Sequence, residues 1–367
     1  MKVVTFVGTR PEIIKVSATV RCLDKQFEHT LVHTGQNYDR QLKDVFLEEL
    51  GMPKVEYYLD AAGDSGVETM ANVLSSSYRV LQEISPDAFL CLGDTNSCMA
   101  LLSAKRLKIP TFHMEAGNRC FDDRVPEEII RRIVDHTADI NLPYTQIAKD
   151  YLIREGLNPY NIVTTGSPMR EVLNSYTEKI AKSVILETLN LELNDYILAS
   201  IHREENVDST KEFLQIIKLL EEIGEQRDVD IILSTHPRTR KKIRELGVQT
   251  KQIRYIEPLG FIDYIALMKS ALVTISDSGT ITEESHILKT KAISIRQSHE
   301  RPEGMEASVL PIIEPNAKLL ENAIKLVLNN DVNNSSVDDY EDTNVADKVA
   351  NTILSYTHYV NRSTWKK

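Results

Sequence analysis

The 367-residue chain is poor in cysteine and has no surplus of positive charge, and both shortages exclude classes of protein. Its four cysteines, Cys22, Cys91, Cys98 and Cys120, show no CxxC spacing, so we expect reduced, mostly buried thiols rather than a disulfide framework. The formal net charge of −11 argues against a nucleic-acid partner held by a basic face. An anion bound by this protein must therefore be held by a few placed cations.

Long apolar runs and targeting segments are absent as well. No run approaches the roughly 20 apolar residues that a membrane helix requires. The stretch 3–7 is too short for the apolar part of a secretory signal. We therefore expect a cytoplasmic protein without a membrane partner. The hydrophobic content of 42% and the chain length are typical of a globular protein with two domains.

Short apolar runs alternate with helical patterns, which is typical of a parallel α/β sheet covered by helices. In the first half of the chain these runs lie at 3–7, 29–34, 88–93 and 111–115. In the second half they lie at 196–201, 229–235, 253–258, 271–276 and 291–296. Residues 329–344 are polar and acidic, as in a surface segment, and a helical pattern follows them. The sequence predicts two doubly wound Rossmann-like domains, joined near residues 165–176, with a cleft between them.

Ligands of open parallel sheets bind at the carboxyl ends of the strands, so functional residues are expected there. The first apolar run ends in the motif GTRPE, in which Thr9 and Glu12 fit a capping box. Free amides at a helix start attract anions, and Arg10 and Lys15 would add positive charge. The alternative is a well-capped helix with solvated cations.

Three acidic residues, Asp94, Glu115 and Glu127, follow strands or loops of the same domain, and Arg131 comes one turn after the last of them. Carboxylates near one sheet edge suit proton transfer when their surroundings push their pKa values apart. The alternative is that Asp94 and Glu127 only cap helices.

The second domain repeats this arrangement with residues that suit a diphosphate. His202 closes one run, and another run ends in Ser278-Gly279-Thr280 before a helix that carries Glu284. Hydroxyls, a glycine and free amides at a helix start bind phosphate oxygens, and the glutamate could bind a ribose. The chain has no GxGxxG, Walker, HExxH or Cys/His pattern, so we expect neither a nicotinamide cofactor nor a metal.

The motifs GTRPE, GDT, HMEAG, PEE, HRE, SDSGT-x-x-EE and ERPE occur in this order. With them the whole chain resembles the non-hydrolysing UDP-N-acetylglucosamine 2-epimerase family. The resemblance implies the GT-B architecture, normally in a homodimer. It implies an N-terminal domain at 1–168 with the acid–base carboxylates, a UDP-binding domain at 169–343, and a last helix within 344–367 that crosses back to the first domain.

The resemblance also implies a reaction and the residues that perform it. UDP is eliminated to leave a 2-acetamidoglycal and is then added back with the opposite configuration at carbon 2. The catalytic positions fall on Asp94, Glu115, Glu127 and His202. The substrate-binding positions fall on Arg10, Lys15, Arg131, Ser278, Gly279, Thr280, Glu284 and Arg301.

Two departures concern positions of the family's allosteric site. The chain has Gln36-Asn37-Tyr38 where bacterial members have a QHR-like triplet, and Arg203-Glu204 where they have two arginines. The chain therefore lacks the pattern that accompanies activation by bound UDP-N-acetylglucosamine.

Four other segments, GDTNSC, EAGNRCFDDRVPEE, HERPEGMEAS and YVNRSTW, are similar to a sister branch of the family. That branch forms UDP-N-acetyl-L-fucosamine from UDP-2-acetamido-2,6-dideoxy-L-talose, a step that suits capsule or O-antigen synthesis. Interconversion of UDP-N-acetylglucosamine and UDP-N-acetylmannosamine is the main alternative. A glycosyltransferase of the same architecture, a sugar-nucleotide sensor and a hydrolysing epimerase are the others.

Overall fold

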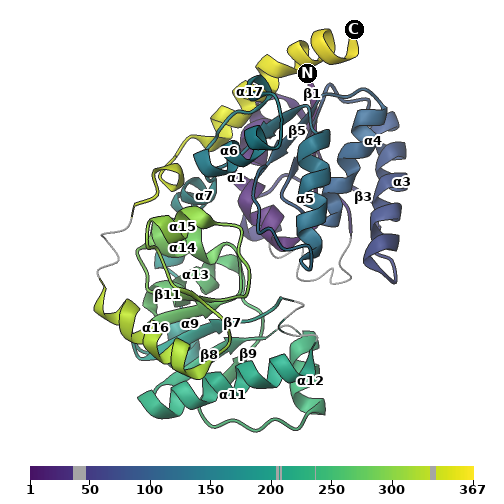
Figure 1. The fold of residues 1–367 in the computed structure, drawn as a ribbon. Coiled ribbons are helices and arrows are strands. Elements are labelled where there is room, and N and C mark those ends of the chain that lie inside the picture. Colours follow the sequence, from purple (N-terminus) through teal and green to yellow (C-terminus); the bar gives the residue numbers. More distant parts are fainter. Residues whose placement is uncertain (36–46, 204–205, 207–208, 236, 331–335) are drawn as a thin grey trace. The chain divides into compact units, whose positions relative to one another are not determined.

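The computed structural model describes residues 1–35, 47–203, 206, 209–235, 237–330 and 336–367 (Figure 1). The chain forms two compact units, the first made of Met1–Ser175 with Asp338–Lys367 and the second of Tyr176–Val337. Each unit has a parallel six-stranded sheet with helices on both faces. This confirms the predicted class, two Rossmann-like units of GT-B type.

The sheet of the first unit has the strand order β3-β2-β1-β4-β5-β6. Its strands are β1 Lys2–Val7, β2 Glu28–His33, β3 Val55–Tyr58, β4 Ala88–Leu92, β5 Thr111–Met114 and β6 Ile140–Leu142. The sequence predicted all except β3 and β6, which are short edge strands interrupted by Glu56 and Asn141. All strands are parallel, but β2 and β3 lie on one side of β1 and the later strands lie on the other, so the strand order reverses between β1 and β4. The loops after two such strands diverge and leave room for a ligand.

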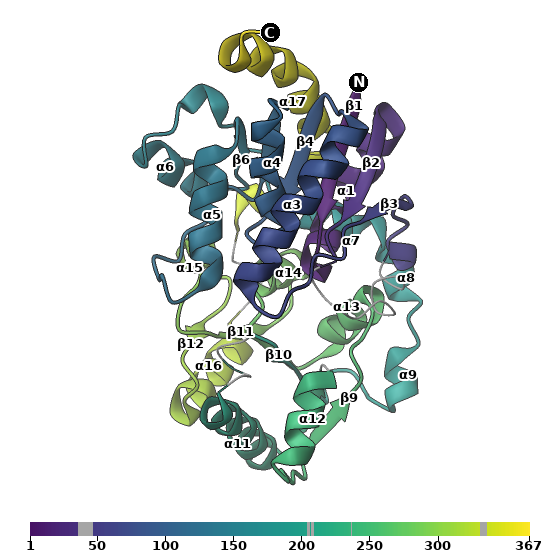
Figure 2. The ribbon, with the colours of Figure 1, turned by 90° about the vertical axis from the view of Figure 1, so that its right-hand side faces the viewer.

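Two groups of helices cover this sheet. They are α1 Arg10–Gln26, α3 Gly66–Ile84, α4 Ala100–Arg106, α5 Pro126–Thr137, α6 Gln146–Arg154, α7 Met169–Ser175 and α17 Val345–Val360. Helix α1 packs against α7 and α17, whereas α3, α4 and α5 lie side by side (Figure 1, Figure 2). Shorter turns are η1 Asn96–Met99, η2 Pro159–Asn161, η4 Asp338–Tyr340 and the terminal π-helix η5 Asn361–Trp365.

The limits of the first unit lie several residues from the predicted 168 and 344. Helix α7 belongs to this unit because it packs against α1. The chain re-enters the unit at Asp338, because the carbonyl of Asp339 accepts a hydrogen bond from the Ser167 amide at 2.8 Å. Tyr340 is almost fully buried there, whereas Asp338 and Glu341 are exposed, so this part of the acidic segment lies on the surface and is anchored by one aromatic ring.

The second unit repeats the same strand arrangement, in the order β12-β11-β10-β7-β8-β9. Its strands are β7 Tyr196–Ser200, β8 Asp230–Ser234, β9 Ile253–Ile256, β10 Val273–Ser276, β11 Ala292–Ile295 and β12 Ile312–Ile313. Only the two-residue edge strand β12 was not predicted. The direction reverses between β7 and β10, so the loops after these two strands are the expected ligand-binding loops of this unit.

Helices again cover both faces of the second sheet. They are α8 Thr177–Ala181, α9 Ile185–Leu189, α11 Thr210–Arg227, α12 Pro237–Glu245, α13 Phe261–Ser270, α14 Ile281–Leu288, α15 Pro302–Glu306 and α16 Ala317–Asn329. Helices α11 and α16 pack together on one face, and α13 packs with α8 and α9 (Figure 1). The strands contribute mainly isoleucine, leucine and valine to the core between these layers.

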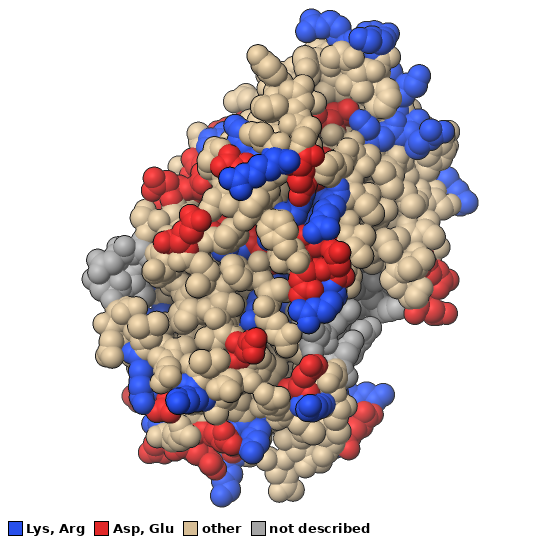
Figure 3. All heavy atoms as spheres, viewed as in Figure 1, with Lys and Arg blue, Asp and Glu red and all other residues tan. Residues whose placement is uncertain are grey.

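The surface agrees with the acidic composition. On the face drawn in Figure 3, Lys and Arg side chains alternate with Asp and Glu in small groups rather than forming one large basic area. In the described ranges no helix is long and apolar enough to span a membrane.

Candidate active site

In the first unit, the GTRPE turn after β1 is tied to the turn after β4 by one buried carboxylate. Glu12 accepts hydrogen bonds from the Gly8 and Thr9 amides at 2.5 and 3.0 Å. It also accepts them from the hydroxyls of Thr95 and Ser97. Burial raises the pKa of Glu12, and these four donors act in the opposite direction. The glutamate half of the predicted capping box is therefore present, and it joins the two turns that carry Arg10 and Asp94.

Glu115 forms a buried ion pair with Lys15. The Lys15 Nζ lies 2.7 Å from Oε1 and 2.6 Å from Oε2 of Glu115, and each side chain is less than a tenth exposed. The φ angle of Glu115 is +64°, in the left-handed region that side chains other than glycine rarely adopt. Strained backbone of this kind is kept where surrounding contacts hold it, commonly at functional sites.

Asp94 has a different cationic partner. Arg131 Nη2 lies 2.6 Å from Asp94 Oδ2, and its Nη1 lies 2.6 Å from Glu128 Oε2. Asp94 remains about a quarter exposed, with a side-chain value of 26%, whereas Glu128 is fully buried. Arg131 thus joins an accessible carboxylate to an enclosed one.

The two neighbouring glutamates of the PEE motif have separate places on α5. Glu128 accepts hydrogen bonds from the Cys120 and Phe121 amides at 3.1 and 3.2 Å. Burial would raise the pKa of Glu128, but the Cys120 amide and the Arg131 charge outweigh it and keep that pKa low. Glu127 is only half-buried, in the first turn of α5. The sequence did not single out Glu128, and only its contacts separate it from Glu127.

The first unit therefore brings the three predicted carboxylates to neighbouring strand ends and to the start of α5. Glu115 is paired with Lys15, Asp94 is paired with Arg131, and Glu127 stands in the first turn of a helix. Carboxylates in unlike surroundings can divide the acid and base roles of a proton-transfer reaction.

In the second unit, His202 is held by an aspartate at the point where the strand order reverses. Asp277, fully buried after β10, lies 3.1 Å from His202 Nδ1 and accepts hydrogen bonds from the His202 and Arg203 amides. Burial would raise the pKa of Asp277, but His202, the Asn206 amide and these backbone donors hold it at about 2. Because Nδ1 faces Asp277, the opposite ring atom, Nε2, points away from it.

The sequence alone did not predict a role for Asp277. This residue stands within the SDSGT motif, but its partners follow another strand, β7. An acidic residue directly after a buried strand was the available signal.

The predicted diphosphate turn, Ser278-Gly279-Thr280, leads into α14 beside a group of buried ions. Arg301 Nε donates to the Gly279 carbonyl at 3.1 Å, and Arg301 Nη2 lies 2.8 Å from Glu283. A Cβ atom at Gly279 would meet a carboxylate oxygen of Glu300, so a larger residue there would push the Glu300 side chain aside.

Glu300 is itself paired with Arg296, at 2.7 Å. Glu284, the predicted ribose-binding residue, is nearly buried on α14. Arg301 with Glu283 and Arg296 with Glu300 thus form two buried ion pairs next to the turn.

One group of possible metal ligands occurs among the described residues. The ligand atoms of Cys91, Cys98 and His113 all lie within 4.8 Å of one another. A metal needs thiolates and a free imidazole lone pair. The hydrogen bond with Cys91, together with burial, raises the pKa of Cys98 well above its usual range, and both His113 nitrogens already have partners. The group does not fit a metal.

Two segments of the chain depart from the family's allosteric-site pattern. Of these, Gln36, Asn37, Tyr38 and Glu204 lie outside the described residues. Arg203 is described, and its Nε donates to the Asp277 carbonyl at 2.9 Å.

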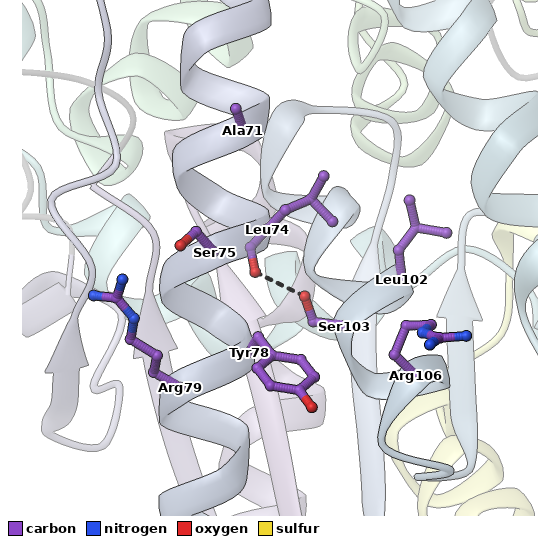
Figure 4. A pocket seen from close by; sticks show the side chains of 8 residues that line it. All are labelled: Ala71, Leu74, Ser75, Tyr78, Arg79, Leu102, Ser103 and Arg106. Carbon is purple, nitrogen blue, oxygen red and sulfur yellow. Dashed lines mark hydrogen bonds between the residues drawn. The ribbon is translucent and has the colours of Figure 1, made fainter.

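A groove separate from these residues lies between α3 and α4 (Figure 4). It is lined by Ala71, Leu74, Ser75, Tyr78, Arg79, Leu102, Ser103 and Arg106. The Ser103 hydroxyl donates to the Leu74 carbonyl at 2.8 Å and joins the two helices at the floor of the groove. None of the predicted site residues lines it.

Comparisons with known proteins agree with this arrangement. A family model described as UDP-N-acetylglucosamine 2-epimerase matches residues 21–354. The chain is 42% identical to the solved UDP-N-acetylglucosamine 2-epimerase of Rickettsia bellii, with a TM-score of 0.91 and 100% of both chains covered. It is 33% identical to the Methanocaldococcus jannaschii UDP-GlcNAc 2-epimerase solved in complex with UDP-GlcNAc and UDP, with a TM-score of 0.90 and coverage of 97% and 100%.

A relative named for another sugar is the UDP-2,3-diacetamido-2,3-dideoxy-D-glucuronate 2-epimerase of Pseudomonas aeruginosa. It is 32% identical over 305 residues, which are 82% of this chain and 84% of the relative. The fold and these comparisons define an isomerase, specifically an epimerase. The chain belongs to the UDP-N-acetylglucosamine 2-epimerase family.

Proposed function

We propose that this protein inverts carbon 2 of a UDP-linked 2-acetamido sugar by eliminating UDP and adding it back. Family membership supports the reaction class, and solved relatives bind UDP-GlcNAc and UDP. The observation that carries the proposal is the set of three carboxylates in the first unit, Asp94, Glu115 and Glu127, each in different surroundings. A reaction that removes and returns a proton on opposite faces needs such a set.

The chemistry explains why UDP must leave. The hydrogen on carbon 2 has no neighbouring carbonyl to acidify it. A base takes that proton, the C–H electrons form a double bond between carbons 1 and 2, and the bond from carbon 1 to the diphosphate oxygen breaks. The UDP anion then adds back to carbon 1 while an acid protonates carbon 2 on the other face. Cations near the diphosphate stabilise the charge of the departing UDP.

The residues divide between proton transfer, stabilisation of the leaving diphosphate and contacts to UDP. We assign proton transfer to Asp94, Glu115 and Glu127, with Lys15 and Arg131 setting the charge around two of them. We assign stabilisation of the leaving diphosphate to Arg10 and His202. The contacts to UDP in the second unit are assigned to Ser278, Gly279, Thr280, Glu284 and Arg301.

For the substrate we propose UDP-2-acetamido-2,6-dideoxy-L-talose, converted to UDP-N-acetyl-L-fucosamine. The relatives named above differ in the sugar they act on, so the family permits this change. A 6-deoxy sugar has a methyl group where a hexose has a hydroxyl, so the loop after the EAG motif is expected to differ between the two substrates. Here that loop carries Phe121, whose ring is 65% exposed and packs edge to face against Tyr151 of α6, with 5.3 Å between the ring centres. The alternative is the UDP-N-acetylglucosamine and UDP-N-acetylmannosamine pair.

Proton NMR in deuterium oxide separates these substrates. One sample contains UDP-N-acetylglucosamine and the other UDP-2-acetamido-2,6-dideoxy-L-talose. Deuterium at carbon 2 and formation of the fuco epimer in the second sample alone support the proposed substrate. Exchange in the first sample assigns the alternative, and exchange in neither refutes carbon 2 epimerisation of these sugars.

We further propose that the protein is a homodimer and that its product enters capsule or O-antigen synthesis, as the family resemblance implies. Sedimentation equilibrium tests the first point directly, and a monomer mass at all concentrations would contradict it.

A further inference from the structure

A fully buried histidine connects the loops that carry two of the three carboxylates. His113 lies on β5, and its Nε2 is 2.7 Å from the Gly93 carbonyl oxygen while its Nδ1 is 2.9 Å from Asp135 Oδ1. Both neighbours are acceptors, a carbonyl on one side and a carboxylate on the other. Both ring nitrogens must therefore carry hydrogen, and the ring is an imidazolium cation.

The charges around the ring are consistent with this state. Burial alone would lower the pKa of His113, but Asp135 and the Gly93 carbonyl outweigh burial and raise it to about 9. Asp135, on α5, has a lowered pKa for the complementary reason, since His113 and Arg119 outweigh its own burial. The other titratable groups that face the ring are the thiols of Cys91 on β4 and Cys98 on η1.

The two hydrogen bonds hold two different strand ends. Gly93 directly precedes Asp94, so its carbonyl fixes the turn of the first carboxylate. His113 itself stands two residues before Glu115. Asp135 Oδ2 then accepts hydrogen bonds from the Gly117 amide at 3.1 Å and from Arg119 Nη1 at 2.6 Å. One cation and one anion thus fix the backbone before Asp94 and on both sides of Glu115.

We propose that His113 is a positioning residue for the carbon 2 reaction, which acts as a buried imidazolium that holds the Asp94 and Glu115 loops at a fixed separation. The expected effect of His113 on kcat rests on the proposed function. It does not require His113 to touch the substrate. Loss of the ring proton would remove one donor and leave either the Gly93 carbonyl or the Asp135 carboxylate without it.

The substitution that tests this is His113→Gln, which keeps one donor but no positive charge. Displacement of a catalytic group by about 1 Å can cost on the order of 100-fold in rate. We expect kcat to fall by about 10- to 100-fold with little change in KM, because the substrate-binding side chains stay in place. The double variant His113→Gln with Asp135→Asn replaces the ion pair by neutral hydrogen bonds and should recover part of that loss.

The matched control is Thr111→Val, on the same strand. The Thr111 hydroxyl is equally buried and donates to Asp139 at 2.9 Å, away from both carboxylate loops. This variant should lower the melting temperature comparably and leave kcat near the wild-type value. Equal losses of kcat in the two variants would reduce His113 to a general structural role and overturn the proposal.

A second readout does not depend on activity. Nitrogen-15 NMR of histidine-labelled protein, with the His113 signal identified by its loss in His113→Gln, should show two protonated ring nitrogens at neutral pH. The wild-type rate should fall as the pH rises through about 9, and this limb should be absent in His113→Gln. A singly protonated ring overturns the proposal. Absence of carbon 2 exchange in the wild type with a doubly protonated ring would instead refute the proposed function alone.

Discussion

The glycine of the EAG motif offers a sharp test of how the first unit is built. Gly117 has φ +83°, and a Cβ atom there would lie 2.8 Å from the Ala148 carbonyl carbon and 2.9 Å from Leu152 Cγ, with the Ala148 oxygen closer still. Gly156 also has a left-handed backbone, with φ +91°, but a Cβ atom there meets nothing within 4 Å. The pair separates backbone strain from collision with α6.

Backbone strain and the collision with α6 set the expected losses of stability in the two variants. The left-handed conformation costs an alanine about 1–2 kcal/mol, so Gly156→Ala should destabilise by no more than this. Gly117→Ala adds the overpacking cost of about 1–3 kcal/mol, for a total of about 2–5 kcal/mol. Relief of the collision must also move the backbone two residues after Glu115. We therefore expect kcat to fall in Gly117→Ala and to stay unchanged in Gly156→Ala.

The single tryptophan makes the assay specific to the first unit. Trp365 lies in η5 of that unit, with its ring under Lys105 Nζ at 4.9 Å from the ring centre. Urea unfolding followed by its fluorescence therefore reports this unit alone. Equal losses of stability in the two alanine variants would refute the close approach of Gly117 to α6.

Three further predictions concern the site. Asp94→Asn or Glu127→Gln should lower turnover by on the order of 10²–10⁴ while UDP still binds by calorimetry, because acid–base catalysis is lost; near-normal turnover in both would contradict the assignment. Arg10→Ala should weaken substrate binding and slow elimination, and unaltered kinetics would remove Arg10 from the site. Asp277, whose folded pKa is about 2 against an ordinary 3.8, contributes stability that is present above pH 3.8 and is lost as the pH falls through about 2. That contribution is about 2 kcal/mol and should be absent from Asp277→Asn in urea unfolding across this range, whereas parallel stability curves would contradict it.

The sequence predicted the strands that bury continuous apolar runs and missed three of the four edge strands, all except β9. Runs such as 196–201 are long and rich in isoleucine and leucine, so periodicity and length identify them. Strands β3 and β6 contain Glu56 and Asn141, and β12 has only two residues, so no apolar run marks them.

The residues of the candidate site likewise fall into predicted and unpredicted groups. Residues directly after a strand, such as Asp94 and His202, were predicted because a parallel sheet collects its strand ends at one edge. Arg131 and Lys15 were predicted as well, but not their pairing with Asp94 and Glu115. Asp135 and Asp277 were missed, because they reach His113 and His202 across 22 and 75 positions of the chain, which no local pattern encodes. The sequence indicates which side chains follow the strands, and only the fold shows which of them are held by other buried charges.

Positional isotope exchange in the UDP-sugar tests elimination and re-addition most directly. The substrate carries oxygen-18 in the bridge between carbon 1 and the diphosphate, and phosphorus NMR follows it during turnover. Elimination frees the terminal phosphate of UDP to rotate before it adds back, so we expect the label to spread into the non-bridging positions. A label that stays in the bridge while carbon 2 is inverted would contradict elimination and re-addition.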